Sequence, residues 1–355
     1  MRGDQDHCQA SNVVSLEKEL GIDEGLRIFL IVLTSLILIV TLTGNVLILY
    51  GSIFRKAVKM EAIDLTQIYS NAVCDILLMV FFYIPILITL ICNEYTLGDA
   101  WCTFTAYFMP TSIMVYNILT NAIGTVFRVW LLKKPPKVRS TYPISRVYWV
   151  IAACVVVAIA PCIIFPALGH KEECFITAKL SCAVKPKHNE KGLKAIWWIY
   201  TVFLVALPLA ILMSANIYTG RVISKVLENS RTATKEQKCR VSLMISTICW
   251  SFLLSYIPMI LVHIGKLSGY YKGRNGEVEP LWCLIPTFFL SIASVTNPFV
   301  LYISNVKFRE YLNGLLGCGG SRNSEGGKGG DGKEGSTTTS SCKIVKKAST
   351  NHSVL

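Results

Sequence analysis

Asp75 is the most informative residue of the sequence, because it is the only acidic or basic side chain within seven long apolar stretches. A carboxylate in hydrocarbon is costly unless it meets water, a cation or hydrogen-bond donors, so it marks a functional site by default. The simpler alternative is a neutral Asp75 hydrogen-bonded to neighbouring helices. An intramembrane enzyme would need paired acids, a histidine cluster or a Ser/Lys dyad, and the stretches offer only Asp75 and His263. We therefore predict a non-enzymatic protein.

The apolar stretches are the elements that must position Asp75. Of the 355 residues, 52% are hydrophobic and 16% charged, and the mean hydropathy of +0.49 is too high for an ordinary soluble domain. The stretches cover residues 28–54, 65–93, 100–127, 147–169, 195–220, 241–265 and 280–306. Each is long enough to cross a bilayer as a helix, and continuous apolar runs exclude a barrel. The predicted fold class is an all-α membrane protein, a seven-transmembrane helical bundle with a short amphipathic eighth helix.

The charge pattern predicts how this bundle lies in the membrane. Lys and Arg are concentrated in the loops after the first, third and fifth stretches, which favours a multi-pass plasma-membrane protein with its N-terminus outside. The net charge of +13 then reflects contact with anionic lipid head groups and not with nucleic acid. We predict an extracellular segment (1–27), the bundle (28–306), the amphipathic helix (307–316) and a disordered cytoplasmic tail (317–355). Residues 1–27 lack signal-peptide features, so the first span should direct insertion.

Ordered motifs distinguish among seven-helix proteins, because the fold alone does not establish function. Each mark is weak alone, whereas the full set in order is a strong signal. The marks are Gly44-Asn45-Val46, Ser70-Asn71-Ala72-Val73-Cys74-Asp75, Cys102 after Gly98 and Trp101, Arg128 with Pro135 seven residues later, Trp149, Pro161, Pro208, Phe252 to Pro258, Asn297-Pro298 and Phe308. This set resembles the rhodopsin-like (class A) G-protein-coupled receptor family over about residues 26–318. The resemblance implies a receptor, with peptide receptors as the favoured branch.

Several positions depart from the family pattern and bear on activation. Phe127 stands where the acidic partner of the family's arginine belongs, and Lys238 stands where a second acid can lock it. Tyr256 replaces the usual tryptophan, and Leu301 occupies the NPxxY tyrosine position with Tyr302 one place later. Without a carboxylate partner for the arginine, the resting state loses a charge-assisted contact, so we predict raised basal signalling if the protein couples.

The resemblance also implies a sodium ion beside Asp75, because the matching positions of the family hold sodium that leaves on activation. Carboxylate, amide and hydroxyl oxygens suit such a hard cation. The predicted ligands are Asp75, Asn117, Ser294 and Asn297. No other cofactor is expected.

The resemblance assigns Arg128 to coupling with a heterotrimeric G protein once the sixth helix swings outward; the alternative is a snorkelling anchor. Pro258 and Pro298, like Pro208, each remove a helix hydrogen bond and create a bend. Because Tyr256 lies two residues before Pro258, we predict that Tyr256, Pro258 and Pro298 form the conformational switch. The alternative is that membrane helices simply tolerate proline.

The cysteine at the outer end of the third span, Cys102, is implied by the resemblance to pair with the loop that follows the fourth span. Cys174 and Cys182 are both available, and the distance of Cys182 from Pro208 resembles that of peptide-receptor relatives, so we choose Cys182. Between them, residues 175–180 alternate loosely in polarity, which predicts a hairpin strand covering the mouth of the pocket.

The predicted ligand pocket lies between the third, fifth, sixth and seventh spans and includes Thr111, Met114, Tyr256 and Thr287. Amine receptors carry an acid at the position matched here by Pro110, so an amine ligand is disfavoured. The lysine-rich loop after the fourth span suits an acidic peptide or an anionic lipid, although such lysines are more often a solvated loop. We favour a peptide.

The tail offers three regulatory signals, each with chance as its alternative. Cys318 follows the amphipathic helix and is placed for palmitoylation, which would anchor the helix to membrane lipid. The hydroxyl cluster at 336–341 suits phosphorylation and an arrestin-like regulator. The terminal Ser353 and Leu355 suit a PDZ protein.

Two other functions were weighed against a receptor. A channel or transporter usually buries several ionisable groups in repeated halves, whereas Asp75 has no repeat partner. A light-driven pump or opsin needs a Schiff-base lysine in the last span, and none lies between Leu281 and Val306. A receptor that couples to G protein is therefore preferred, and the alternatives are a seven-helix channel or transporter, or a receptor-like protein with constitutive or no G-protein coupling.

Overall fold

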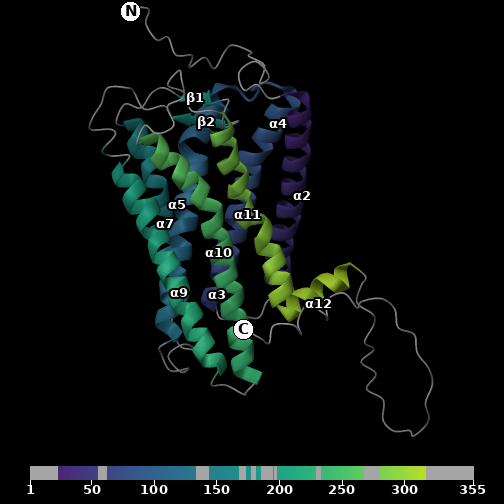
Figure 1. Ribbon diagram of the computed structural model, residues 1–355, viewed down its shortest axis with the longest axis vertical. Helices are drawn as coiled ribbons and strands as arrows, with labels where there is room; N and C mark the ends of the chain where they lie inside the picture. The colour runs from purple at the N-terminus through teal and green to yellow at the C-terminus, as the bar shows by residue number, and fades with distance from the viewer. Residues whose placement is uncertain are drawn as a thin grey trace, which may run out of the picture.

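The computed structural model describes residues 23–54, 62–132, 144–167, 173–176, 181–184, 195, 198–228, 233–267 and 280–316. Within these residues seven long helices form one bundle (Figure 1). In chain order they are α2 (Glu24–Phe54), α3 (Ala62–Leu78) continued by η1 (Met79–Tyr83) and α4 (Ile84–Cys92), α5 (Gly98–Leu132), α7 (Ile144–Ala167), η3 (Thr201–Ala206) continued by α9 (Leu207–Glu228), α10 (Ala233–Leu267) and α11 (Pro280–Ser304). The predicted helical bundle is confirmed.

The bundle is apolar on its outside, and its interior combines an apolar core with buried polar side chains. Large hydrophobic side chains such as Trp149, Val156 and Ile303 are exposed, whereas Asn45, Asp75 and many hydroxyl groups are buried. This distribution suits a lipid environment, because apolar side chains face hydrocarbon while polar groups find partners inside. Among the described residues, the segments that are long and apolar enough to cross a membrane are Glu24–Phe54, Leu65–Cys92, Trp198–Val222 and Leu284–Ser304, with shorter apolar helices at Ser145–Pro161 and Ser246–Val262.

A short helix leaves the bundle at one end, and a hairpin covers the other (Figure 1). Helix α12 (Val306–Leu315) begins at Asn305, whose side chain accepts a hydrogen bond from the Phe308 backbone N–H at 3.0 Å. Phe308 is fully buried, so this side chain anchors α12 to the bundle. The helix lies within one residue of the predicted amphipathic segment.

The hairpin consists of β1 (Glu173–Ile176) and β2 (Ser181–Val184), paired antiparallel with Cys174 opposite Ala183 and Phe175 opposite Cys182. The predicted strand at 175–180 has the right location but the wrong limits. The first strand ends at Ile176 and the second begins at Ser181, and residues 177–180 lie outside the described residues. Both strands contact α5.

Two π-helical segments, η1 and η3, interrupt the α-helical hydrogen-bond pattern and were not anticipated by the sequence patterns. Each ends just before a proline, Pro85 and Pro208 respectively. Proline has no backbone N–H to donate and its ring crowds the carbonyl four residues earlier, so a widened turn relieves the conflict. The two helices therefore continue through their prolines.

The first and last membrane helices approach each other closely at Gly44. A Cβ atom added to Gly44 would lie 2.4 Å from Pro298 Cγ, so only glycine leaves room for this contact. The glycine of the Gly44-Asn45-Val46 motif is therefore needed for packing, because it lets α2 lie against Pro298 of α11.

Candidate functional site

Asp75 lies at the centre of a buried polar cluster that joins α3 to α11. Ser294 Oγ donates to Asp75 Oδ1 at 2.6 Å, and Asn297 Nδ2 donates to Oδ2 at 2.7 Å. Each carboxylate oxygen therefore has its own donor, and Asp75 is only 3% exposed. Two short bonds to charged oxygen compensate much of the cost of burying the acid.

The cluster extends to two further helices. Asn45 Nδ2, on α2, donates to the Thr41 carbonyl at 3.0 Å and to the Ser294 carbonyl at 3.3 Å. Tyr256, on α10, contacts Asn117 and lies within electrostatic reach of Asp75. Helices α2, α3, α5, α10 and α11 thus meet around one carboxylate.

The predicted cation ligands fit a hard cation by the chemistry of their oxygens. The buried Oδ1 atoms of Asn117 and Asn297 have no hydrogen-bond partner among the described residues, and neither has Oδ1 of Asn45. A small cavity with room for about one water molecule is lined by Asn45, Asn71, Asn297 and apolar side chains; of the predicted ligands, Asn297 lines it and Asp75, Asn117 and Ser294 do not. Within the described part of the chain, no group of three or more His, Cys, Asp and Glu side chains lies together, so the available donors are amide, hydroxyl and carboxylate oxygens.

Arg128 lies in a second buried cluster, nearer the α12 end of the bundle. Arg128 Nη2 donates to Gln67 Oε1 at 2.8 Å. Gln67 Nε2 in turn donates to Asn121 Oδ1 at 2.8 Å, and Asn121 and Asn71 exchange amide hydrogen bonds at 3.1 and 3.2 Å. Phe127 and Lys238 stand where the family has acids, and the sequence patterns did not indicate the neutral acceptor that Arg128 contacts, Gln67.

A glycine makes this contact possible. A Cβ atom added to Gly124 would lie 2.9 Å from Gln67 Oε1 and 3.2 Å from its Cδ. Any larger residue at position 124 would therefore displace the amide that holds Arg128. The overlooked signal was a polar side chain every four residues, Gln67 and Asn71 on one helix and Asn117 and Asn121 on the next, which places each pair on one helix face.

Helix α10 contacts α5 beside this cluster. Thr125 Oγ1 and Cys249 Sγ are 3.5 Å apart, and both residues are fully buried. Leu301, at the family's tyrosine position, is buried in the core, while the Tyr302 hydroxyl donates to Asn313 Oδ1 on α12 at 3.1 Å. The displaced tyrosine therefore bonds to α12 and not to the interior cluster.

The predicted switch residues lie inside helices as expected, with Pro258 within α10 and Pro298 within α11. The Tyr256 ring is buried against Phe252, with a centroid distance of 4.4 Å. Tyr256 therefore lies in the core, two residues before Pro258, and its role as a switch stays a prediction.

The predicted pocket residues are only partly described. Met114 is half-buried, Thr287 is buried and accepts the Tyr83 hydroxyl through its carbonyl, and the Thr111 side chain lies outside the described residues. A crevice between α3, α5 and α7 and the small cavity beside Asn297 are lined by residues other than Met114, Tyr256 and Thr287. The pocket stays a prediction.

Cys102 forms a disulfide, as predicted. The strand carrying Cys182 packs against α5, which carries Cys102, and the partner stays a prediction. Cys318, the hydroxyl cluster at 336–341, Ser353 and Leu355 lie outside the described residues.

Proteins of known family have similar sequences and the same helical architecture. Residues 44–301 match the family "7 transmembrane receptor (rhodopsin family)". Chemerin-like receptor 1 of Sus scrofa is 24% identical, over 84% of this chain and 83% of its own length. Melatonin receptor type 1C of Xenopus laevis is 20% identical, over 87% and 73% respectively. Squid rhodopsin has the same fold, with a TM-score of 0.66 and 14% identity over 84% of this chain and 87% of its own.

In the described part of the chain, seven long helices enclose a buried carboxylate and a buried arginine, which is the architecture of a helical membrane protein. With the family match over most of its length, the chain belongs to the rhodopsin family of seven-transmembrane receptors. It is a multi-pass membrane protein and a G-protein-coupled receptor, and not an enzyme. Receptors of this family act between an extracellular ligand and a G protein.

Proposed function

We propose that this receptor lies in the plasma membrane with its N-terminus outside and transmits binding of an extracellular peptide to a heterotrimeric G protein by helix rearrangement. The observation that carries the proposal is the uncharged contact that holds Arg128. Arg128 Nη2 donates to the neutral amide oxygen of Gln67, and such a bond is weaker than one to a carboxylate, so modest helix motion can break it.

The proposed route begins at the hairpin end. A ligand in contact with Thr111, Met114, Tyr256 and Thr287 displaces the Tyr256 ring, which packs on Phe252. Helix α10 then moves about Pro258, and the Thr125 to Cys249 contact opens. Separation of α10 from α5 exposes Arg128 to the G protein.

Asp75 links this motion to α11. We propose that Asp75, Asn117, Ser294 and Asn297 hold a sodium ion in the resting state, with the orphaned amide oxygens as neutral ligands. The ion would supply positive charge to the buried carboxylate and cross-link α3 to α11. When α11 bends at Pro298, Ser294 and Asn297 move away from Asp75, so the residues that hold the cation also report the motion.

The ligand class rests on sequence. One relative is named for chemerin, another for melatonin and others are rhodopsins, so the similarity alone does not select a ligand. Helix α11 contains no lysine, which disfavours a retinal Schiff base. We favour an acidic peptide for the lysine-rich loop, and we propose that a Cys102 to Cys182 disulfide holds the hairpin over the pocket.

Regulation by the tail is proposed from sequence alone. Palmitoyl at Cys318 would extend the anchoring already given by Phe308, an arrestin-like regulator would bind the phosphorylated cluster at 336–341, and a PDZ protein would bind the end at Ser353 and Leu355.

The test is a G-protein activation assay in cells, run without ligand and with peptide and lipid pools. We expect activation of at least one Gα class above mock-transfected cells, and loss of that signal in Arg128→Ala at equal surface expression. Arg221→Ala is the matched control, because Arg221 is an exposed arginine on α9. Identical signals from wild type and Arg128→Ala contradict the proposal, and an ion current independent of G protein would favour a channel.

A further inference from the structure

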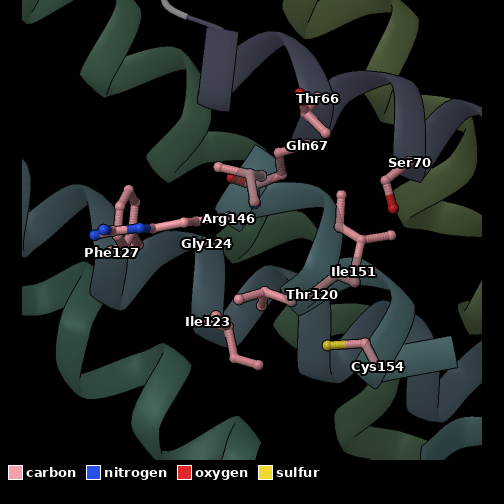
Figure 2. A pocket seen from close by; sticks show the side chains of 12 residues that line it. Thr66, Gln67, Ser70, Thr120, Ile123, Gly124, Phe127, Arg146, Ile151 and Cys154 are labelled. Carbon is pink, nitrogen blue, oxygen red and sulfur yellow. The ribbon is translucent and has the colours of Figure 1, made fainter. Parts of the chain in front are cut away.

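A membrane-facing crevice lies between α3, α5 and α7 in the half of the bundle that contains Arg128. Helix α7 packs mainly on α5 and little on α3, which leaves the gap. Its wall includes Ile123 and Val150, both lipid-exposed, and its floor includes Gln67 and Gly124. Figure 2 shows Phe127 and Arg146 together at one end of the crevice and Cys154 at the other.

The walls of the crevice are chemically suited to an acyl chain. Ser70 Oγ donates to the Tyr116 hydroxyl at 2.9 Å, and Thr120 Oγ1 donates to the Tyr116 carbonyl at 2.8 Å. The Gln67 amide is bonded to Arg128 and Asn121. Because these polar groups are satisfied within the protein, the surface left to a guest is mainly apolar.

One cation stands at the mouth of this apolar crevice. Arg146, in the first turn of α7, lines it and is itself exposed. Tyr148 and Trp149, which follow Arg146 in the first turns of α7, are 56% and 77% exposed, as aromatic side chains near the level of lipid head groups are. The guanidinium is therefore placed where a phosphate of the adjacent leaflet lies.

From an apolar slot with one arginine at head-group level, we infer that the crevice binds an anionic phospholipid of the leaflet on the α12 side. One acyl chain lies between Ile123 and Val150, and Arg146 pairs with the head-group phosphate. Since Gln67 and Gly124 form the floor, a chain in the crevice packs against the residues that hold Arg128. The inference requires membrane insertion, which the family establishes, and does not depend on G-protein coupling.

The test is photo-crosslinking of purified receptor in nanodiscs of phosphatidylcholine that contain a diazirine-tailed phosphatidylserine, with adducts mapped by peptide mass spectrometry. We expect adducts on residues 120–127 and 147–154, and about fivefold less labelling in Arg146→Ala, since one basic residue at the membrane surface contributes ~1 kcal/mol. Arg146→Lys should keep much of the labelling. Val150→Trp, which places a large side chain in the crevice from its exposed wall, should abolish the labelling.

Arg221→Ala is the matched control and should label like wild type. Adducts located elsewhere, or an equal loss in Arg146→Ala and Arg221→Ala, would overturn the inference in favour of diffuse surface charge. A diazirine sterol that labels the crevice regardless of Arg146, with no phosphatidylserine adduct, would also overturn it. Competition by soluble glycerophosphoserine as strong as that by the lipid would show an anion site without an acyl slot.

Discussion

One buried cluster surrounds a negative charge, Asp75, and the other surrounds a positive charge, Arg128, and the two charges are held by different hydrogen bonds. Around Asp75, a carboxylate is held by two short donors from a single neighbouring helix, α11. At Arg128, Nη2 donates to an amide oxygen on α3, that of Gln67. Neither charge has an oppositely charged protein partner among these bonds. We expect the contact between Arg128 and Gln67 to open first, because it depends on a flexible glutamine side chain, whereas the two donors to Asp75 lie one turn apart on α11.

The largest expected effect comes from removing the charge at Asp75 while keeping its shape. Asp75→Asn can still hydrogen-bond Ser294 and Asn297 after amide reorientation, but it loses the only charged oxygen of the set. We expect sodium affinity to fall by about 3 kcal/mol or more, as when one member of a buried charge pair is removed. Thermal unfolding in NaCl against choline chloride measures this. A sodium-dependent rise in melting temperature that persists in Asp75→Asn contradicts the site.

The next effect tests the weaker cluster. Gln67→Ala removes the acceptor of Arg128, and a hydrogen bond to a charged group contributes about 1.5–3 kcal/mol. We expect basal G-protein activation to rise roughly tenfold at equal surface expression. Gln67→Glu should lower it below wild type by pairing the charge. Ser35→Ala is the control, because Ser35 on α2 bonds only to its own helix at Ile31. Equal basal activity in all three variants would rule Gln67 out as the resting partner.

A smaller effect is expected from restoring the family acid. Phe127→Asp places a carboxylate next to Arg128 on the same helix, and adjacent helical positions do not face each other. The decrease in basal activation should therefore be weaker than in Gln67→Glu, about twofold. Second-messenger measurement without ligand decides. A decrease larger than that of Gln67→Glu would reverse the proposed ranking of the two partners.

The smallest effect concerns the contact between α5 and α10. Thr125→Ala removes a weak bond to Cys249, with an expected gain in basal activity of less than about threefold, because neutral hydrogen bonds contribute roughly 0.5–1.5 kcal/mol. Maleimide labelling of Cys249, mapped by mass spectrometry, should be slow in wild type and faster in Gln67→Ala. The exposed Cys92 provides the internal control. Unchanged labelling of Cys249 in a basally active variant would separate Arg128 release from α10 motion.

The membrane helices could be predicted from the sequence because long apolar runs indicate which segments cross a bilayer. The resemblance to the receptor family identified Asp75, Ser294 and Asn297, which the structure brings into contact. It did not identify Gln67 as the partner of Arg128, since the family pattern directs attention to acids and the contact depends on the space left by Gly124. The limits of the hairpin and the partner of Cys102 depend on tertiary packing, which periodicity does not encode.

The π-helical segment η1 changes how side chains on its two sides are oriented around the helix axis. A π turn accommodates one residue more than the α-helical turn, and each helical residue advances by about 100° around the axis. Side chains on the two sides of η1, such as Asp75 and Ile86, therefore keep an angular offset that a straight helix would not have. Loss of that one residue would turn the hairpin-side face of the helix while leaving Asp75 in register, so side chains near the hairpin can be reoriented without disturbing the carboxylate cluster.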